Sequence, residues 1–488
     1  MALDDLKKER LKKLENIKNL GVDPYPATTK RNQVIAQARE TLGKDAAVTG
    51  RIRSLRLHGK ITFADVEDES GRIQLFFSQT ELPDKYDFLA NLDLGDFLQA
   101  EGEVFQTQAG EKTVRVKNYQ LLAKSLRPLP SVWYGLEDVE ERYRQRYVDL
   151  IINPEVKKVM DTRHKIVRFI RSFLEDKGFV EVETPILQPI YGGATAKPFI
   201  TKHNALDTNL YVRISDELYL KRLIVGGYEK VFEIGKDFRN EGIDRQHSPE
   251  FTQMEFYWAY ADYEDLMRLG EEMISKLVKE IHGSYKFKYE GMELNFAAPF
   301  KRIGFNELIK THSGIDLEKV SSEEELLKDI KGKGIKLDLK GVVGMGPLID
   351  ELYKKVARPT VQQPIFLIDY PYEMKPLSKR KEGDSRKSAS FQLLVMGYEL
   401  VNAYSELNDP QEQETRWREE MNLAKKGLEE HQVLDEDYIR ALEYGMPPTA
   451  GFGLGIDRLT AVLTGQHTVK DVILFPTLKP ESKKNKAR

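Results

Sequence analysis

A change of hydrophobic pattern along the chain constrains its fold more than any other feature. Between residues 46 and 122, apolar and polar residues alternate in short runs, which is typical of half-buried β-strands. Beyond residue 150, longer stretches with helical spacing are mixed with strands. The chain has 488 residues, more than one hydrophobic core usually organises. The sequence therefore predicts two or three domains, of which an early one is all-β.

The all-β region is expected to be an OB-type barrel. Five strands are predicted, and a helix over Tyr86–Leu92 falls between the third and the fourth. Five strands with a helix at that position indicate an OB fold, a common platform for single-stranded nucleic acid. Another small barrel with a structural role would have similar spacing, so this alternative stays open. The expected strands are Val48–Arg56, Ile61–Glu67, Ile73–Phe77, Phe97–Val104 and Val114–Leu122.

Proline, glycine and changes of charge divide the rest of the chain. A helix over residues 3–20 ends at Gly21, and Arg127-Pro128-Leu129-Pro130 closes the predicted barrel. Asn153 and Pro154 are typical of a helix start. The expected organisation is a helical segment over 1–45, the barrel over 46–126, a linker over 127–150, a main α+β domain over 151–480 with a glycine-interrupted helical insertion at about 312–360, and a basic tail over 481–488.

Composition excludes several classes of function. The chain has no cysteine, which excludes disulfides, thiolate nucleophiles and cysteine-based zinc sites. Its apolar runs are far shorter than a membrane span and its N-terminus lacks a signal-peptide layout, so we expect a cytoplasmic protein that does not engage a membrane. The net charge of −3, from 75 basic and 78 acidic residues, neither supports nor excludes a nucleic-acid partner.

The densest group of reactive side chains lies in a predicted strand–loop–strand unit over residues 231–260. Alternation on its second strand places a polar set on one face and an apolar set on the other. A half-solvated antiparallel strand is the simplest explanation of such a face. The loop adds possible phosphate ligands, although an arginine-rich hairpin alone is usually surface. The polar face holds Phe251, Gln253, Glu255 and Tyr257, and the loop donors are Arg239, Arg245 and His247.

The glycine-rich segment Gly451–Leu459 only superficially matches a dinucleotide-binding loop. Ile456 occupies the third glycine position and no strand-bearing unit follows, so Rossmann and P-loop interpretations fail. Close backbone packing, together with one anion contact by Arg458 at a helix start, explains the pattern better.

Three carboxylates are candidates for binding a cation. Glu217 lies in the first turn of a predicted helix, where an acid also complements the helix dipole. Glu399 and Glu406 flank Asn402 and Tyr404 on one predicted strand. Strand parity does not place both glutamates on one face, so a magnesium ion shared by them would require a β-bulge or a bend between them.

Along nearly its whole length the chain resembles class II lysyl-tRNA synthetases. A helix over 154–177 with a strand over 179–185 is similar to motif 1, the dimer-forming element, while Phe238–Phe251 is similar to motif 2 and Gly451–Arg458 to motif 3. The whole class shares these motifs, so they imply the reaction type and not the amino acid. Stretches similar to lysine-enzyme signatures are Tyr191–Ala194, Lys202–Leu206, Glu217–Arg222 and Asn402–Pro410.

The resemblance implies an α+β fold, with an N-terminal OB-type β-barrel that binds the anticodon. A class II synthetase catalytic domain would follow, built on an antiparallel β-sheet flanked by helices. The implied activity is that of a homodimeric, AMP-forming lysine–tRNA ligase. L-lysine and ATP would form lysyl-adenylate and pyrophosphate, and lysine would then pass to the 3′ end of tRNA(Lys). Such catalysis needs positioning and charge stabilisation but no protein nucleophile.

The resemblance also implies roles for individual residues. Arg239 and Arg458 would be catalytic, and Mg²⁺ on Glu399 and Glu406 would bridge phosphate oxygens. ATP would contact Arg239, Glu241, His247, Phe251, Glu399 and Arg458. Lysine would contact Gly193, Glu217, Glu255, Tyr257, Asn402, Tyr404 and Glu406, and the anticodon would contact Arg51, Phe63, Gln74 and Glu111.

Four positions depart from the family pattern. Gln392 stands where a glutamate is usual, and a neutral amide is a poorer magnesium ligand. Lys375 stands in place of a small hydroxyl residue, and Tyr404 in place of phenylalanine. Gln246 stands where an arginine commonly precedes the motif 2 histidine, with Arg245 one position earlier.

Three alternatives remain open. An enzyme of the same class for aspartate or asparagine would favour a cation at Glu217 or Glu255, and neither is replaced. A tRNA-independent lysine ligase would lack the N-terminal barrel. A non-catalytic RNA-binding paralogue is supported only by Gln392, because the other catalytic residues are retained.

Overall fold

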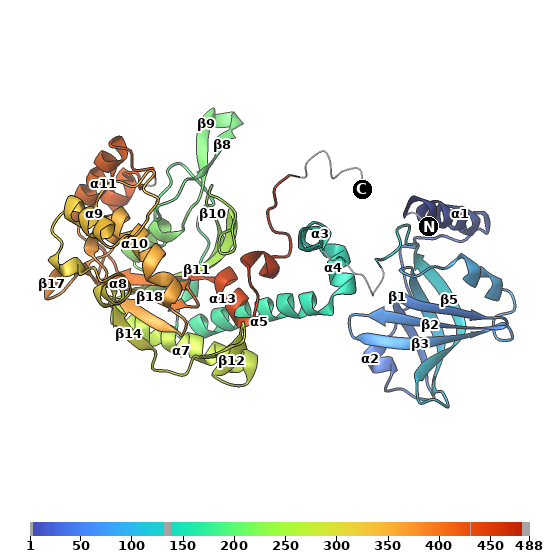
Figure 1. Cartoon of the computed structure of the whole chain (residues 1–488). Helices are drawn as coiled ribbons and strands as arrows, with labels where there is room; N and C mark the ends of the chain where they lie inside the picture. Colours follow the sequence, from blue (N-terminus) through green and yellow to red (C-terminus); the bar gives the residue numbers. More distant parts are fainter. Residues whose placement is uncertain (1–2, 131–135, 137, 430, 481–488) are drawn as a thin grey trace. The chain divides into compact units, whose positions relative to one another are not determined.

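The computed structural model describes residues 3–130, 136, 138–429 and 431–480. The chain divides into two compact units, one up to residue 137 and the other from residue 138 onward (Figure 1). Each unit has its own hydrophobic core. No helix among the described residues combines the length and the apolar composition needed to cross a bilayer.

The first unit is a closed five-stranded β-barrel, which confirms the predicted OB-type fold. Its strands neighbour one another in the order β1-β2-β3-β5-β4. The helix expected between the third and fourth strands is a 3₁₀ helix, η1 (Tyr86–Asn91). The other elements are α1 (Leu3–Asn19), α2 (Ile35–Ala38), β1 (Asp45–His58), β2 (Ile61–Asp68), β3 (Gly71–Ser78), β4 (Phe97–Gln106) and β5 (Lys112–Ala123).

A glycine allows two strands of this barrel to approach closely. The pairing of β4 with β5 shifts register between Glu101 and Gly102. A Cβ atom on Gly102 would lie 1.9 Å from the carbonyl oxygen of Arg115. Only glycine therefore fits this irregularity without moving the backbone of β5.

The second unit is built on an eight-stranded sheet in the order β14-β15-β18-β19-β20-β11-β10-β6. Neighbouring strands are antiparallel, except for β14–β15 and β10–β6, which are parallel. The predicted antiparallel sheet is thus confirmed, with a parallel pair at each edge. The strands are β6 (Val180–Glu181), β10 (Lys230–Phe238), β11 (Glu250–Ala259), β14 (Lys301–Gly304), β15 (Ile365–Ile368), β18 (Ser390–Val395), β19 (Tyr398–Ser405) and β20 (Thr449–Gly455).

Helices α5 (Pro154–Asp176), α7 (Tyr263–His282) and α13 (Ile456–Leu463) pack on one face of this sheet. The core between them contains Phe232, Met254, Phe256, Phe391 and Phe452. The opposite sheet face carries the polar residues of β11 and β19. The sheet therefore has one apolar face for stability and one polar face that is free for chemistry.

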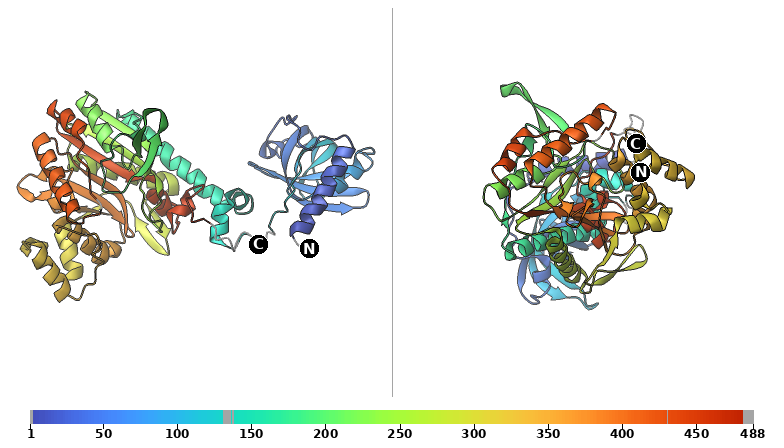
Figure 2. Two further views of the ribbon diagram at one scale, coloured as in Figure 1. Left: turned by 90° about the horizontal axis from the view of Figure 1, so that it is seen from above. Right: turned by 90° about the vertical axis from the view of Figure 1, so that its left-hand side faces the viewer.

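Smaller elements surround this framework. Helices α8 (Phe305–Ser313), α9 (Glu323–Gly332) and α10 (Met345–Val356) share a separate hydrophobic cluster and gather at one end of the unit (Figure 2). The remaining elements are β7 (Leu187–Gln188), β8 (Phe199–His203), η2 (Asn204–Leu206), β9 (Thr208–Val212), α6 (Glu217–Val225), β12 (Lys286–Tyr289), β13 (Met292–Asn295), η3 (Leu317–Lys319), η4 (Arg358–Thr360), η5 (Tyr372–Met374), β16 (Arg380–Lys381), β17 (Asp384–Ser388), α11 (Pro410–Lys425), α12 (Glu436–Glu443) and η6 (Val469–Val472).

From residue 138, the stretch expected to be a linker is helical, whereas residues 131–135 and 137 lie outside the described part of the chain. The helical part contains α3 (Val139–Arg144) and most of α4 (Arg146–Ile152), which belong to the second unit. The buried Arg146 pairs with Asp149 at 2.5 Å and donates to the Leu474 carbonyl at 3.0 Å. These contacts of Arg146 are polar and produce no hydrophobic repeat, so the sequence pattern did not predict them.

We predict that Gly102→Val destabilises the barrel by about 3 kcal/mol, because overpacking a close strand crossing displaces backbone. Hydrogen exchange measured by mass spectrometry should show faster exchange in residues 45–123 and little change beyond residue 138. Gln108→Ala, at an exposed loop position, is the control. Unchanged protection in β4 and β5 would contradict the role assigned to Gly102.

Candidate active site

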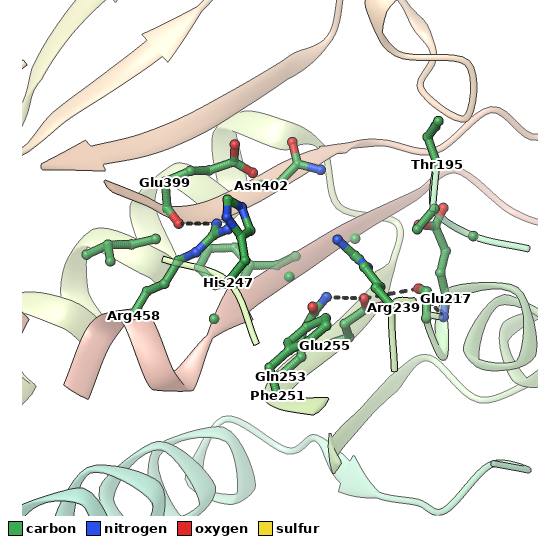
Figure 3. Close-up of a pocket in the computed structure, with 18 of the residues that line it drawn as sticks. Thr195, Glu217, Arg239, His247, Phe251, Gln253, Glu255, Glu399, Asn402 and Arg458 are labelled. Carbon is green, nitrogen blue, oxygen red and sulfur yellow. Dashed lines mark hydrogen bonds between the residues drawn. The ribbon is translucent and has the colours of Figure 1, made fainter. Parts of the chain in front are cut away.

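A cavity of about 290 Å³ opens on the polar face of the large sheet (Figure 3). Its walls come from β11, β19, β20, the start of α6, the segment 193–195 and the segment 374–377. Most residues predicted to bind ATP or lysine meet here, although they come from segments far apart in the sequence. They are Gly193, Glu217, Arg239, Glu241, His247, Phe251, Glu255, Tyr257, Glu399, Asn402, Tyr404 and Arg458.

Strand β11 presents its side chains as the alternation predicted. Phe251, Gln253, Glu255 and Tyr257 line the cavity. Met254 and Phe256 are fully buried in the core on the other face. The polar face of this strand is therefore a cavity wall and not a half-solvated surface.

The glycines of β20 create space for the side chains of its neighbours. A Cβ on Gly451 would lie 2.2 Å from Glu406 Oε1 and 2.4 Å from the Tyr257 ring. A Cβ on Gly453 would lie 3.1 Å from Gln253 Nε2. The glycine-rich segment is thus explained by close packing, as expected, and the middle of the cavity floor is backbone.

One end of the cavity is acidic. Tyr404 donates its hydroxyl to both carboxylate oxygens of Glu217, at 2.8 and 2.9 Å. Lys221 of α6 is fully buried and pairs with Glu217 at 2.5 Å and also with Glu406. These carboxylates raise the pKa of the Lys221 ammonium although burial opposes them. Two carboxyl groups thus face one internal ammonium, and burial raises the pKa of Glu406 well above its usual range.

The magnesium role predicted for Glu406 stays a prediction, and in this structure the carboxylate has another partner. It lies behind the cavity wall, is 1% exposed and is paired with Lys221. The β-bulge that the prediction required is present, because Leu393 pairs with Val401 while Leu394 pairs with Glu399. This bulge brings Glu399 beside Asn402 and leaves Glu406 at the other end of the strand.

A second acidic group lies beside the first. Glu255 accepts hydrogen bonds from Tyr257 at 3.1 Å, Ser215 at 3.3 Å and also Gln253. Carboxylate oxygens of Asp216, Asp237 and Glu255 all lie within 4.8 Å of one another. Burial and the charges of Glu217 and Asp237 raise the pKa of Glu255 to about 7. Burial likewise raises the pKa of Asp216 well above its usual range, with the Glu255 charge adding to the shift. A cationic ligand would relieve this repulsion.

Cations and an aromatic ring line the rest of the cavity. The Arg239 guanidinium lies 5.0 Å from the centre of the Phe251 ring. Arg458 donates to the Glu399 carbonyl at 3.0 Å, and burial lowers its pKa. Figure 3 shows His247 near Arg458, with Glu399 and Asn402 side by side. Such donors and rings suit a nucleotide and its phosphates.

Arg245 does not join this group. It pairs with Glu290 at 2.8 Å and donates to the carbonyl of His467. Gln246, the residue after it, lines the cavity instead. Of the three phosphate donors expected from the loop, the structure therefore brings only Arg239 and His247 into the site.

Sequence reasoning missed several residues of the cavity. Lys375 and Gln253 line it, and Asp216 supports Glu255 from behind. Strand parity had placed Gln253 on the correct face without giving it a role. Lys375 was noticed only as a departure from the family pattern.

The four residues predicted to bind the anticodon belong to the first unit. Phe63 faces Phe76 across β2 and β3 at 5.3 Å, and Gln74 accepts from Thr113 at 3.0 Å. The Arg51 guanidinium lies 4.2 Å from the Phe97 ring centre. Glu111 lies at the end of the β4–β5 connection, where it is exposed. The strand residues are only half-buried, so rings and polar groups are accessible on the barrel's outer face.

Comparisons with known proteins agree with this geometry. Residues 138–479 match the family model for tRNA synthetases class II (D, K and N), and residues 46–129 match that of the OB-fold nucleic acid binding domain. The chain is 48% identical over 483 residues to lysine–tRNA ligase of Pelotomaculum thermopropionicum, spanning 98% of this chain and 96% of that protein. It is 47% identical over 487 residues to lysine–tRNA ligase of Syntrophomonas wolfei, spanning 99% and 98%.

We predict that Glu255→Gln stabilises the ligand-free protein in a pH-dependent way. The raised pKa means that ionising Glu255 costs folding free energy as pH rises from about 4.5 through about 7. The variant should unfold nearly like the parent at pH 4 and be more stable at pH 8, by on the order of 3 kcal/mol. Thermal unfolding at both pH values measures this difference. An equal difference at both values would contradict the assigned pKa.

Proposed function

The chain belongs to the class II tRNA synthetases of the D, K and N group and is a lysine–tRNA ligase, and from this premise we propose how its residues carry out the reaction. The observation that carries the proposal is the acidic end of the cavity, which lies opposite the cationic end in one site. Lysine would place its side-chain ammonium among Glu217, Glu255 and Tyr257. An ammonium ion buried without carboxylate partners is costly, so these residues favour lysine over an uncharged or acidic amino acid.

ATP would occupy the cationic end. Its adenine would stack on Phe251, with Arg458 over the other face of the base and Glu241 near the nucleotide. Arg239 would hold the α-phosphate and His247 would reach the terminal phosphates. These groups hold the triphosphate without forming a covalent bond to it.

Activation then needs only alignment and charge compensation. A lysine carboxylate oxygen attacks the α-phosphorus, the bond to the β-phosphate oxygen breaks, and pyrophosphate leaves with the electron pair. Glu399 fits a magnesium ion, which typically binds through one or two carboxylates plus substrate phosphates. When bound, the ion would draw negative charge from the phosphate oxygens. Glu406 contributes indirectly, by holding Lys221 and through it Glu217.

Transfer to tRNA completes the reaction. A hydroxyl of the 3′-terminal adenosine would attack the lysyl-adenylate carbonyl, with AMP as the leaving group. The barrel would bind the anticodon through Arg51, Phe63, Gln74 and Glu111, by stacking and hydrogen bonding to unpaired bases. A tRNA partner also makes the cytoplasm the expected site of action.

We also propose a homodimer formed through α5 and the neighbouring edge of the sheet. Val180 of the edge strand β6 is 48% exposed, and the nearby Ile186 and Leu187 are similarly exposed. Large apolar side chains on an unpaired edge favour association with another chain. A second copy is the partner that the class implies.

We predict that Glu255→Gln lowers kcat/KM for lysine in ATP–pyrophosphate exchange by about 10- to 100-fold, the usual cost of losing a charged hydrogen-bond partner. The dissociation constant for ATP alone should change less than about threefold. Glu264→Gln, exposed on α7 behind the sheet, is the matched control. If the parent protein supports no lysine-dependent exchange, the non-catalytic alternative is favoured.

We predict that Phe63→Ala raises KM for tRNA(Lys) in aminoacylation by about 10-fold or more, because it removes a stacking platform for a base. Pyrophosphate exchange, which needs no tRNA, should be unchanged. Leu42→Ala, an exposed apolar position of the same unit, serves as the control. An equal effect on both assays would show that Phe63 acts through folding.

A further inference from the structure

Lys375 is a cation in the wall of the active-site cavity for which the mechanism above has no use. It follows η5, and its side chain lines the cavity. Its Nζ donates to Asn402 Oδ1 at 2.7 Å and lies 4.7 Å from the centre of the Tyr370 ring. Both contacts are with neutral groups, so neither cancels the charge.

Lys375 has no counter-ion among the described residues, unlike the buried Lys221. Across the described ranges of the chain, no carboxylate oxygen lies within 4.0 Å of its Nζ. Lys221, by contrast, is paired with two carboxylates. Burial lowers the pKa of the Lys375 ammonium, while Glu399 opposes the shift from a longer distance. An ammonium in this position gains from binding an anion.

Gln392 supports both groups that contact Lys375. It is the cross-strand neighbour of Asn402. Its Oε1 accepts a hydrogen bond from the Tyr370 hydroxyl at 2.5 Å. The two neutral contacts of Lys375 are therefore backed by an uncharged side chain, while the carboxylates of Glu399, Asp350 and Glu217 act on the ammonium from farther away.

The order of side chains along β19 indicates which part of the substrates meets Lys375. Glu399 lies at the nucleotide end of the cavity, and Tyr404 binds Glu217 at the ammonium end. Asn402 lies between them on the same strand and holds Lys375. The ammonium of Lys375 is therefore placed where the amino-acid carboxylate meets the α-phosphate.

We propose that Lys375 is a catalytic residue that binds an oxyanion of the reacting pair, either the carboxylate of the amino acid or the α-phosphate of ATP. Attack of a carboxylate on a phosphate ester brings two negatively charged groups together, and a fixed ammonium at their junction reduces that repulsion. Arg239 and Arg458, which also lack carboxylate partners among the described residues, would share the phosphate charge. This inference rests on the proposed function.

The test compares Lys375→Met, which keeps the apolar stem, with Lys375→Arg, which keeps the charge. Calorimetry measures the binding of ATP, of lysine and of 1,5-diaminopentane, the lysine analogue without a carboxylate. If Lys375 binds the carboxylate, Lys375→Met weakens lysine about 10- to 100-fold and leaves the diamine unchanged. If it binds the α-phosphate, the same variant weakens ATP by a similar factor. Lys375→Arg should recover most of either loss.

Lysine-dependent pyrophosphate exchange in the parent protein separates this inference from the function on which it rests. Exchange that is present in the parent and falls at least tenfold in Lys375→Met supports the role. If Lys375→Met leaves ATP binding, lysine binding and exchange unchanged, the role is overturned. An equal loss of affinity for lysine and for the diamine also overturns it, because that result would indicate a collapsed pocket. Absence of exchange in the parent contradicts the proposed function itself. Lys379→Met, close in sequence and exposed, is the matched control.

Discussion

The buried ion group of Lys221, Glu217 and Glu406 is the interaction on which the site depends. Removing one partner from such a group typically costs about 3–5 kcal/mol, because an uncompensated charge remains inside the protein. The group holds Glu217 against Tyr404 and fixes the first turn of α6 beside the large sheet. It also places two carboxyl groups around one ammonium, so a cationic side chain of a substrate would meet acidic partners there. The ion group that stabilises this part of the protein thus includes a residue proposed to bind the substrate, Glu217.

The large sheet separates stability from chemistry by using its two faces differently. Helices α5, α7 and α13 bury the aromatic side chains of one face, while the other face is left to polar groups of β11 and β19. Glu217 and Glu255 lie on one side of the site with Arg239 and the half-buried Phe251 beside them, and Arg458, His247 and Glu399 lie on the other side (Figure 3). In the proposed mechanism, this distribution of charge would orient an amino acid and a nucleotide toward each other. A site of this kind needs no reactive side chain, because proximity and charge provide the rate enhancement.

The sequence allowed the fold and most of the site to be predicted, since alternation and motif spacing are local properties. The barrel, the antiparallel sheet and the inward face of β11 followed from them. The pairing of Glu406 with Lys221 was not predicted, because Lys221 is distant in sequence and strand parity gives no information about such a partner. Arg245 was misassigned because Glu290 and His467, which hold it, also come from distant segments. Lys375 had been noticed, but only three-dimensional contacts show that it enters the cavity without a counter-ion.

The bare backbone of β20 has a consequence for how this protein can change over evolutionary time. Gly451 and Gly453 contact no ligand in the proposed mechanism. Each nevertheless leaves space for neighbouring side chains, namely Glu406 and Tyr257 beside Gly451, and Gln253 beside Gly453. A side chain at either position would rearrange the acidic end while leaving every charged residue present. Substitutions at these two glycines would therefore disturb the amino-acid specificity of the site, although neither glycine carries a functional side chain. A new specificity would more readily arise at the cavity walls, because a Cβ on Gly451 would collide with Glu406 and Tyr257.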